Sequence, residues 1–572
     1  MTKNIAENET FFFRELIKTI KEKKLSKEEL SKIKQGLCKK YNIKKPPTDI
    51  EILTRAEKEE LEILKLYLKT KPVRTISGVA VIAIMAKPSK CPHGRCIYCP
   101  GGPSSYFGDV PQSYTGKEPA TMRAIRSNFD PYVQVFSRLE QYFVSGHNPE
   151  KVELIIMGGT FPSLPKRYQE NFVAGAFKAM NDFSKLFYKN RTFDFDRFRE
   201  FFELPGSIHD KIRTKKIIRK IKSIKNKTKI VLEKEQKINE KSNIRCVGLT
   251  IETRADYANE KEAKQLLKFG CTRVELGVQS VYDSILENIE RGHSVEKIID
   301  AFRTLKDFGF KINAHYMIGL PGSNVKMDIE GLKRLFSDEN FRPDMLKIYP
   351  CLVMKGTKLY DLWKNKKYKP LNIETAAAII AEFKRHVPEY CRIMRIQRDI
   401  PSHTIAAGPI MTNLRQYVNK LTKEKGIECR CIRCREIKNQ EIKKPELLVK
   451  EYCASGGKEF FISFEENDKI IGFCRLRFPS DNNKVAFVRE LHVYGPAESL
   501  KEKGKIQHRG FGKRLLKKAE NIALINNKKK IFIISGIGVR EYYRKLGYKK
   551  SGSYMVKVLH QQKKKKYKNI KN

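Results

Sequence analysis

Acidic side chains are scarce in this chain of 572 residues. Asp and Glu number 65 against 115 Lys and Arg, and the formal net charge is +50. Such an imbalance disfavours a basic protein tail as the partner and favours a polyanion, because lysine and arginine release counterions from phosphates. The alternative explanation is a lysine-rich proteome, in which Lys and Asn replace other surface residues everywhere.

Long apolar runs are also missing. No uninterrupted stretch approaches the roughly 20 apolar residues of a membrane span, and the start, MTKNIAENETFFFREL, lacks the pattern of a signal peptide. We therefore expect a cytoplasmic protein with no membrane partner. In that compartment the 13 cysteines are not expected to form disulfides. Three of them fall within 91–99 and three within 429–434, which indicates metal sites.

The length predicts two to four domains. In residues 1–75 apolar residues recur three and four apart with lysines between them, which predicts a basic helical region. Ser26, followed by Glu28 and Glu29, is a helix start without a full capping box. The lysine-rich faces of these helices could bind tRNA or could simply be solvated.

From residue 76 to about 395, buried-strand runs alternate with helical pattern. VAVIAIMA, KVELIIMGGT, IRCVGLTIET, TRVELGVQS, KINAHYMIGLPG and DMLKIYP are six such runs. They predict an α/β fold, a full or partial TIM-like barrel whose chemistry lies at the carboxyl ends of the strands. Residues 184–240 are charged and weakly periodic, and we interpret them as an insertion of helices and loop.

The remainder divides into a linker, a second domain and a tail. Residues 396–450 form the linker that contains the second cysteine cluster. Alternating strands over 451–560, with a helix starting near Gly510, predict a small α+β domain. The basic tail, 561–572, is expected to be disordered.

The first cysteine cluster is Cys91-x4-Cys96-x2-Cys99, directly after the first barrel strand. Three thiolates can hold three irons of a 4Fe-4S cluster and leave the fourth iron open for a ligand. Structural zinc is the alternative, but no fourth ligand lies nearby in the sequence. The pattern therefore favours an open iron–sulfur cluster.

The second cluster is Cys429-x-Cys431-x2-Cys434. Thiolates at this spacing can share one tetrahedral structural zinc whose fourth ligand comes from elsewhere. His403 and Cys453 are candidates for that ligand, and the sequence does not choose between them. Three free thiols are the alternative.

The C-terminal domain carries Gln507-x-x-Gly510-x-Gly512 at a predicted helix start. Backbone N–H groups at such a start form an anion site, and the glycines allow a pyrophosphate to approach closely. This motif is typical of Gcn5-related acetyltransferases.

The motifs follow one another in the order of a known family. CPHGRCIYCPGGP, MGGT, VGLTIETRAD, ELGVQSVYDSIL, LKIYP, CRCIRCRE, RELHVYG, QHRGFG and ISGIGVREYYRKLGY lie between about 72 and 560. By these motifs the chain resembles the radical S-adenosylmethionine (SAM) superfamily, and specifically the catalytic subunit of Elongator and its stand-alone archaeal relatives. Its cysteine spacing is one residue longer than the superfamily's commonest C-x3-C-x2-C.

The resemblance implies roles for residues at strand and helix ends. It implies that SAM is bound by Gly158, Gly159, Thr160, Glu252 and Gln279. It implies that acetyl-CoA is bound by Glu490, Leu491, His492, Val493, Phe511, Gly512, Lys513 and Tyr543, and by Lys151 from the barrel. The candidate catalytic residues are Lys151, Lys347, Tyr542 and Tyr543. Salt bridges at the barrel mouth or on the surface, and plain packing of the tyrosines, are the alternatives.

The reaction that the resemblance implies joins both domains. A radical made from SAM would act on the methyl group of acetyl-CoA, and a carboxymethyl group would be left on C5 of the wobble uridine in the anticodon stem-loop of a tRNA. The chain would then be an acyltransferase that needs an electron donor and acts alone, as a homodimer or with Elongator-like partners. The main rival is a protein lysine acetyltransferase with Glu490 as general base and the barrel as a scaffold. An RNA-binding module with degenerate sites is a third reading.

Overall fold

The structure is a computed structural model that describes residues 2–71, 75, 77–206, 210–411, 413–437, 442–482, 484–495 and 510–560. It divides into two compact units, residues 1–84, 127–153 and 170–246, and residues 85–126, 154–169 and 247–572. The expected basic tail and residues 507–509 of the glycine motif lie outside the described residues. None of the described helices is long and apolar enough to cross a membrane.

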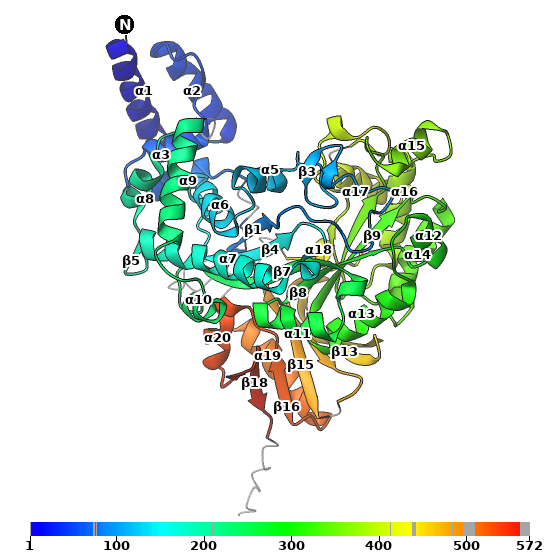
Figure 1. The fold of residues 1–572 in the computed structure, drawn as a ribbon. Coiled ribbons are helices and arrows are strands. Elements are labelled where there is room, and N and C mark those ends of the chain that lie inside the picture. Colours follow the sequence, from blue (N-terminus) through cyan, green and yellow to red (C-terminus); the bar gives the residue numbers. More distant parts are fainter. Residues whose placement is uncertain are drawn as a thin grey trace, which may run out of the picture. The chain divides into compact units, whose positions relative to one another are not determined.

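The first unit is mainly helical (Figure 1). Its helices and its small hairpin are α1 (Thr2–Glu22), α2 (Lys27–Lys40), α3 (Asp49–Arg55), α4 (Leu61–Leu68), α6 (Pro131–Val144), most of α7 (Lys166–Phe187), β5 (Tyr188–Lys189), β6 (Thr192–Phe193), α8 (Phe195–Phe202), α9 (Lys211–Lys225) and α10 (Leu232–Asn239). The helical expectation for the N-terminal region is therefore confirmed.

One detail of the predicted N-terminal helices was wrong. Ser26 forms a full capping box, because its side chain accepts a hydrogen bond from the Glu29 backbone N–H while the Glu29 carboxylate accepts one from the Ser26 N–H. Thr48 and Glu51 make a second capping box at the start of α3. These reciprocal caps fix where the helices begin in a segment that is otherwise lysine-rich.

The charged segment 184–240 has an aromatic core of its own. Phe183 and Phe187 of α7 pack with Phe198 of α8, with ring centroids 6.2 and 5.5 Å apart, and Phe143 of α6 stacks on Phe193 at 3.9 Å. These rings are buried or half-buried. The segment is thus a folded helical layer of the first unit, because its scattered phenylalanines meet only in three dimensions.

A seven-stranded sheet forms the barrel-like part of the molecule. Its strand order is β1-β4-β7-β8-β9-β10-β11, and the pairs from β7 to β11 are parallel. The strands are β1 (Val79–Met85), β4 (Lys151–Met157), β7 (Arg245–Arg254), β8 (Arg273–Gln279), β9 (Lys311–Ile318), β10 (Met345–Pro350) and β11 (Arg392–Arg395). An open sheet of seven such strands is a half-barrel, so the partial form of the expected barrel is confirmed, with β11 as an additional strand.

The second unit also contains helices that connect or follow these strands. They are α5 (Pro119–Arg126), α11 (Glu260–Phe269), α12 (Asp283–Asn288), α13 (Val295–Asp307), α14 (Val325–Ser337), α15 (Lys358–Lys364), α16 (Ile373–Phe383), α17 (Leu414–Glu424) and α18 (Ile432–Arg435), with a hairpin of β2 (Gly102–Ser105) and β3 (Gly108–Val110). The alternation of strand and helix places loops at the carboxyl ends of parallel strands, where sites form.

The C-terminal domain belongs to the same compact unit. Its sheet has the order β12-β13-β14-β15-β16-β18-β17, with β12 (Glu446–Ala454), β13 (Gly457–Glu466), β14 (Lys469–Phe478), β15 (Val485–Val493), β16 (Lys530–Ile533), β17 (Lys549–Ser551) and β18 (Tyr554–Val558). Helices α19 (Phe511–Ile525) and α20 (Arg540–Arg544) complete it. All pairs are antiparallel except β15 with β16, as expected for an α+β domain.

A buried ionic network joins this domain to the half-barrel. A bulge in β15 at Arg489 points its guanidinium to Asp344 before β10, at 2.5 Å, and to Glu459 of β13, at 2.9 Å. Arg477 of β14 pairs with Asp307 of α13 at 2.6 Å. Burial opposes ionisation, but Arg489 holds the pKa of Asp344 well below its usual value. These carboxylates and guanidinium groups satisfy one another, as buried charges must.

Candidate active sites and metal centre

The first cysteine cluster lies in the loop that follows β1. The loop is tied down by backbone hydrogen bonds, from Ile97 N to Ile289 O at 3.2 Å and from Leu359 N to Ile97 O at 2.9 Å. Cys96 and Cys99 are buried and Cys91 is half-buried. The fold therefore holds three thiols beyond the carboxyl end of β1, as expected from their place directly after the first strand run.

Each thiol has a polar neighbour. The Cys91 sulfur lies 3.9 Å from the Thr160 hydroxyl, and the Cys99 sulfur accepts a hydrogen bond from the Ser113 N–H at 3.2 Å. The Cys96 sulfur lies 3.8 Å from the buried guanidinium of Arg291. Burial raises the pKa of Cys91 and of Cys99. Neighbouring donors of this kind suit sulfurs that carry negative charge when a metal is bound.

The spacing of the sulfurs distinguishes the two cysteine clusters. A tetrahedral zinc with bonds of about 2.3 Å separates its sulfur ligands by about 3.8 Å. Among the described residues, the one group of three or more metal-ligating side chains with all ligand atoms within 4.8 Å is Cys429, Cys431 and Cys434. Cys91, Cys96 and Cys99 are more widely spread. Their separation does not suit one zinc ion and is compatible with a cluster in which each thiolate binds a different iron.

The predicted SAM residues gather beside this loop. Gly158 and Gly159 follow β4 with φ of +117° and +94°, and a Cβ on Gly159 would lie 3.0 Å from Gln112. The Gly158 N–H donates to Glu252 at 3.3 Å, and the Tyr114 hydroxyl donates to the same carboxylate at 3.1 Å. Burial raises the pKa of Glu252. Thr160 completes this edge through its contact with Cys91.

Gln279 reaches the same region through Arg291. It ends β8 in the left-handed region, with φ of +67°, and its amide lies beside Gly277. The Arg291 guanidinium donates to the Gly277 carbonyl at 2.6 Å and contacts the Cys96 sulfur. Arg291 was not among the predicted site residues, and neither was His93, whose ring nitrogen lies 3.4 Å from that sulfur. The arginine of RGH and the histidine inside the cysteine motif were the available signals.

Lys347 belongs to a polar cluster inside the half-barrel. Its ammonium lies 2.5 Å from Glu275 of β8, and the same carboxylate binds the His315 imidazole at 2.5 Å and the Asn313 amide at 3.0 Å. Burial opposes the charge, but Glu275 raises the pKa of Lys347. Burial, and next Lys347, lower the pKa of His315 to about 4. Lys347 is thus a charged donor and His315 a neutral ring near pH 7.

The backbone of β15 is open along its second half. Val485–Val488 pair with β16, whereas Glu490–Val493 pair only with β14 in the described part of the chain. The two parallel strands therefore diverge after Val488. This divergence leaves one edge of Glu490, Leu491, His492 and Val493 without a pairing strand among the described residues, and the binding of pantetheine amides there stays a prediction.

Glu490 itself is held in a buried ion pair. Its carboxylate accepts a hydrogen bond from Arg475 at 2.9 Å and lies 3.5 Å from the Lys311 ammonium. Burial opposes ionisation, but Lys311 and Arg475 lower its pKa to about 2. A general base works best with a pKa near the operating pH. The structure therefore disfavours Glu490 as the base of a lysine acetyltransferase.

The first turn of α19 contains Phe511, Gly512 and Lys513, preceded by Gly510 with φ of +80°. A Cβ on Gly512 would lie 3.1 Å from the Tyr542 hydroxyl, so this glycine allows the hydroxyl to approach the helix start. Tyr542 is half-buried, whereas Tyr543 is buried and packs on Tyr542 and Tyr548. Burial raises the pKa of both phenols.

Lys151 is the first residue of β4 and belongs to the first unit. Its side chain is half-buried, and burial lowers the pKa of its ammonium. Its reach to acetyl-CoA stays a prediction.

The second cysteine cluster is compact. The Cys431 and Cys434 sulfurs are 3.6 Å apart, close to the separation that a tetrahedral zinc imposes. Hydrogen bonds from Cys429 and Cys434 lower the pKa of Cys431, which favours the thiolate that a metal binds. Neither predicted fourth ligand, His403 or Cys453, belongs to this group. The three predicted cysteines are therefore brought together, without either of those partners.

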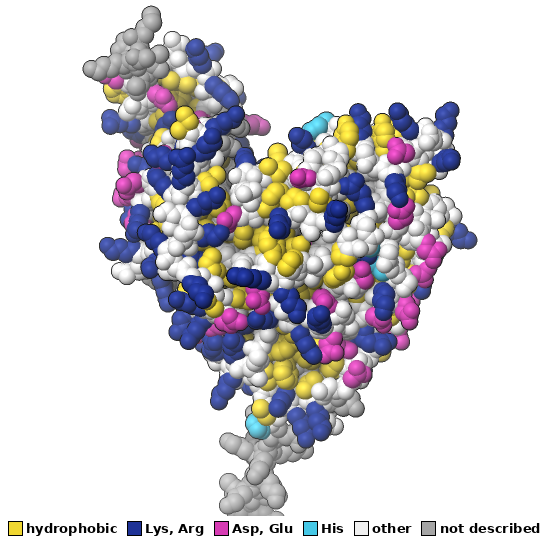
Figure 2. Space-filling model, in the orientation of Figure 1, with side chains coloured by type: hydrophobic (Ala, Val, Ile, Leu, Met, Phe, Trp, Pro, Cys, Tyr) yellow, Lys and Arg dark blue, Asp and Glu magenta, His cyan; other side chains and the backbone are white. Residues whose placement is uncertain are grey.

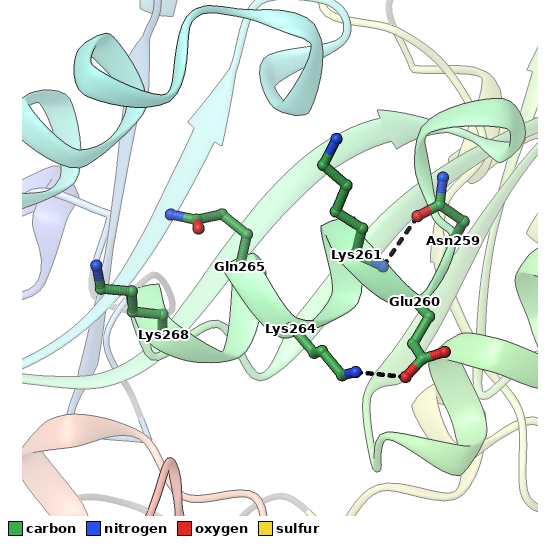
Figure 3. A pocket seen from close by; sticks show the side chains of 6 residues that line it. All are labelled: Asn259, Glu260, Lys261, Lys264, Gln265 and Lys268. Carbon is green, nitrogen blue, oxygen red and sulfur yellow. Dashed lines mark hydrogen bonds and ion pairs between the residues drawn. The ribbon is translucent and has the colours of Figure 1, made fainter.

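A shallow hollow on α11 contains none of the predicted residues (Figure 3). It is lined by Asn259, Glu260, Lys261, Lys264, Gln265 and Lys268. The Lys264 ammonium reaches Glu260 at 2.5 Å along the helix surface. The hollow is the exposed face of one helix and is separate from the groups described above.

Comparison with known families supports the two-domain organisation. The Radical SAM superfamily matches residues 87–335, and the Radical_SAM C-terminal domain matches residues 343–424. The ELP3 N-terminal domain matches residues 11–76, and the acetyltransferase (GNAT) family matches residues 429–548. The fold and these matches define the class: a radical SAM enzyme that carries a GNAT acetyltransferase domain. These domains imply a 4Fe-4S cluster, SAM and acetyl-CoA.

Individual relatives give the family. The tRNA uridine(34) acetyltransferase of Methanocaldococcus infernus is 47% identical over 95% of this chain and 98% of its own length. Elongator complex protein 3 of Homo sapiens is 39% identical over 93% of each chain. The solved structure of the archaeal Methanocaldococcus infernus Elp3 with an N-terminal deletion superposes with a TM-score of 0.67 at 40% identity, covering 85% of this chain and all of that one. The chain belongs to the Elongator complex protein 3 family.

Proposed function

We propose that this chain modifies tRNA, placing a carboxymethyl group on C5 of the wobble uridine with acetyl-CoA as the source of the two carbons. One observation carries the proposal. The same compact unit contains the loop of Cys91, Cys96 and Cys99 and the second half of β15, whose one edge has no pairing strand among the described residues. The archaeal relatives are named for acetyl transfer to uridine 34 of tRNA. The net charge of +50 suits a nucleic acid substrate.

Cys91, Cys96 and Cys99 would hold three irons of a 4Fe-4S cluster, and SAM would take the fourth. When bound, this pair supplies a carbon-centred radical. Gly158 and Gly159 let a ligand approach the backbone, while Glu252 and Gln279 offer polar contacts at the same edge. Arg291 places a fixed positive charge against the Cys96 sulfur. These residues would bind SAM and orient it against the cluster.

In the C-terminal domain, the open edge of Glu490–Val493 would bind the pantetheine amides, and Phe511–Lys513 would receive the pyrophosphate at the start of α19. Tyr542 is the phenol that lies beside that start, so it is the stronger candidate to donate a hydrogen bond to the thioester. Tyr543 supports it by packing. Lys151 would reach the same ligand.

Lys347 would act inside the half-barrel. Glu275 holds its ammonium in place and keeps it charged, so that it can donate to an oxygen of the substrate. A zinc bound by Cys429, Cys431 and Cys434 would be structural. The boundaries 1–75, 76–395, 396–450 and 451–560, a tRNA-binding role for residues 1–75, an electron donor, and either a homodimer or Elongator-like partners belong to the same proposal.

An anaerobic assay tests the proposed function. The reduced protein, with its iron content measured, is incubated with SAM, acetyl-CoA and tRNA, and the tRNA nucleosides are analysed by mass spectrometry. We expect carboxymethylated uridine at position 34 only when all components are present. In Tyr542→Phe the yield should fall about 100- to 1000-fold, as for the loss of one donor to a developing oxyanion, with Tyr543→Phe as the matched comparison. Acetylated lysine with unmodified uridine, at full iron content, would overturn the proposal in favour of the lysine acetyltransferase.

A further inference from the structure

Helix α9 has an unusual composition. Its sequence, KIRTKKIIRKIKSIK, contains eight lysines and arginines in 15 residues and no acidic residue. Asp210 caps its start by accepting hydrogen bonds from the N–H groups of Ile212 and Arg213. Ile217 and Ile221 are buried against the first unit. The helix is therefore a packed element, and its basic residues lie on a fixed scaffold.

Half of these basic side chains have acidic partners in the first unit. Arg213 pairs with Glu140 at 3.3 Å, and Lys225 pairs with Asp130 at 2.6 Å. Lys216 and Lys220 both reach Glu203 at 2.7 Å. Salt bridges of this kind hold the helix to its neighbours and explain four of the eight positive charges.

The other four form a column on the opposite side. Lys211, Lys215, Arg219 and Lys222 are exposed, and no ion pair or hydrogen bond joins their side chains to any described residue. Intervals of four, four and three residues place them on one helix face, about 16 Å from first to last at 1.5 Å per residue. On the face shown in Figure 2, Lys and Arg side chains gather over α9. We call this column the α9 ridge.

No acidic side chain in the described part of the chain forms an ion pair with the α9 ridge. Like charges four residues apart destabilise a helix, and Lys211 stands in the first turn, where the helix dipole disfavours a cation. A lysine-rich composition alone does not explain it, because other lysine-bearing helices include acidic partners. Lys264 pairs with Glu260 on α11 (Figure 3), and Lys333 pairs with Glu330 on α14.

We propose that the α9 ridge binds successive phosphates along the backbone of the RNA substrate. This inference rests on the proposed function and names a part of the surface that recognises its substrate. Four exposed cations in line match a row of phosphates, which attract lysine and arginine without reading bases. An acidic protein fits less well, because protein interfaces need an apolar centre and Ile212 is the one large apolar side chain exposed on α9.

The α9 ridge lies in the first unit, whereas the cysteine loop and the C-terminal domain lie in the second. None of its four residues is among those proposed to hold the iron–sulfur cluster, SAM or acetyl-CoA, so we expect it to contribute affinity for RNA and not cofactor chemistry. Changing it should alter tRNA binding and leave tRNA-independent SAM cleavage unchanged.

The test compares two full-length variants that lose four charges each. In the first, Lys211, Lys215, Arg219 and Lys222 are changed to Gln, which keeps helix propensity. In the control, Lys261, Lys264, Lys268 and Lys297 on α11 and α13 are changed to Gln. Binding of fluorescent tRNA is titrated between 50 and 200 mM KCl. The ridge variant should bind about 10- to 100-fold more weakly, and its slope of log K against log salt should be shallower by about 3–4.

The control should keep the slope of the wild type within about 1. A ridge variant with the affinity and slope of the control would overturn the inference. If the ridge variant loses helix by circular dichroism, single Lys215→Gln and Arg219→Gln variants decide instead, with an expected slope change of about 1 each. Failure of the proposed function is separate: it would appear as unmodified uridine in the wild type, while the salt slopes still decide whether the α9 ridge binds RNA.

Discussion

The two cysteine clusters of the second unit show how spacing in the fold separates metal chemistries that look alike in sequence. Cys429, Cys431 and Cys434 bring three sulfurs within 4.8 Å, with Cys431 and Cys434 only 3.6 Å apart. Cys91, Cys96 and Cys99 are spread more widely around a loop. We call Cys429, Cys431 and Cys434 the compact trio, and Cys91, Cys96 and Cys99 the wide trio. A compact trio suits a single ion, and a wide one suits a polynuclear cluster.

Their surroundings differ in the same direction. The wide trio is next to groups that could bind a ligand, including the Gly158–Gly159 turn and the Arg291 guanidinium. The compact trio lies between the half-barrel and the C-terminal domain along the chain, with α18 starting inside it. The comparison predicts that one cluster supports chemistry and the other supports stability.

The largest effect should follow from breaking the wide trio. Cys96→Ala removes one thiolate and should abolish SAM cleavage, because a cluster with two protein ligands is not held. Affinity for tRNA should stay within a few fold of the wild type. Deoxyadenosine formation under reducing conditions and iron content measure the outcome. Deoxyadenosine at the wild-type rate would contradict the assignment of the cluster.

A smaller effect should follow from breaking the compact trio. Cys431→Ser should lose the bound zinc and lower Tm by about 5 °C or more, since structural metal binding contributes to folding. Metal analysis and thermal unfolding check this. Iron content and SAM cleavage per folded molecule should be kept at low temperature. If zinc is retained, or if iron is lost as well, the division of roles between the trios is wrong.

The smallest effect should follow from a change in the reduction potential of the cluster that the wide trio would hold. Gln112 is buried, and its amide oxygen accepts a hydrogen bond from the Cys99 thiol at 3.1 Å. A metal-bound thiolate has no proton to donate, so the amide would turn its NH2 group to the sulfur, and hydrogen bonds to cluster sulfurs set reduction potential. Gln112→Leu should keep the iron content and slow SAM cleavage about 3- to 10-fold. A redox titration followed by electron paramagnetic resonance measures the shift. An unchanged midpoint potential would show that the amide plays no part.

Much of this organisation could be predicted from local patterns. The strands that end at Met157, Gln279 and Pro350 were recognisable as apolar runs, and the cysteine spacings alone indicated metal. The strand that contains Glu490–Val493 was recognisable from its alternating pattern, whereas its expected role came from the resemblance to Gcn5-related acetyltransferases. Such patterns predict a strand or a metal site from a short stretch of sequence, without information about distant residues.

Other features depend on contacts that sequence distance hides. The phenylalanines of 184–240 form a core only when α6, α7 and α8 meet, and β11 is only four residues long. Glu275 could not be linked to Lys347 and His315 without the register of three strands. Glu490 is held by ion pairs with Arg475 and Lys311, which are not its neighbours in the sequence. Its unsuitability as a general base could therefore not be predicted from the sequence.

The ionic network around Arg489 constrains how the two domains can change in evolution. Its guanidinium is fully buried, and its partners Asp344 and Glu459 belong to the half-barrel and to the C-terminal domain. The half-barrel or the C-terminal domain alone would leave charged side chains of this network without their partners. Removing one partner of a buried ion pair costs about 3–5 kcal/mol. Gly536 strengthens this dependence, since any side chain there would collide with the Val247 carbonyl of β7. The two domains are therefore expected to change together, and neither can be exchanged for a relative's domain unless the matching face comes with it.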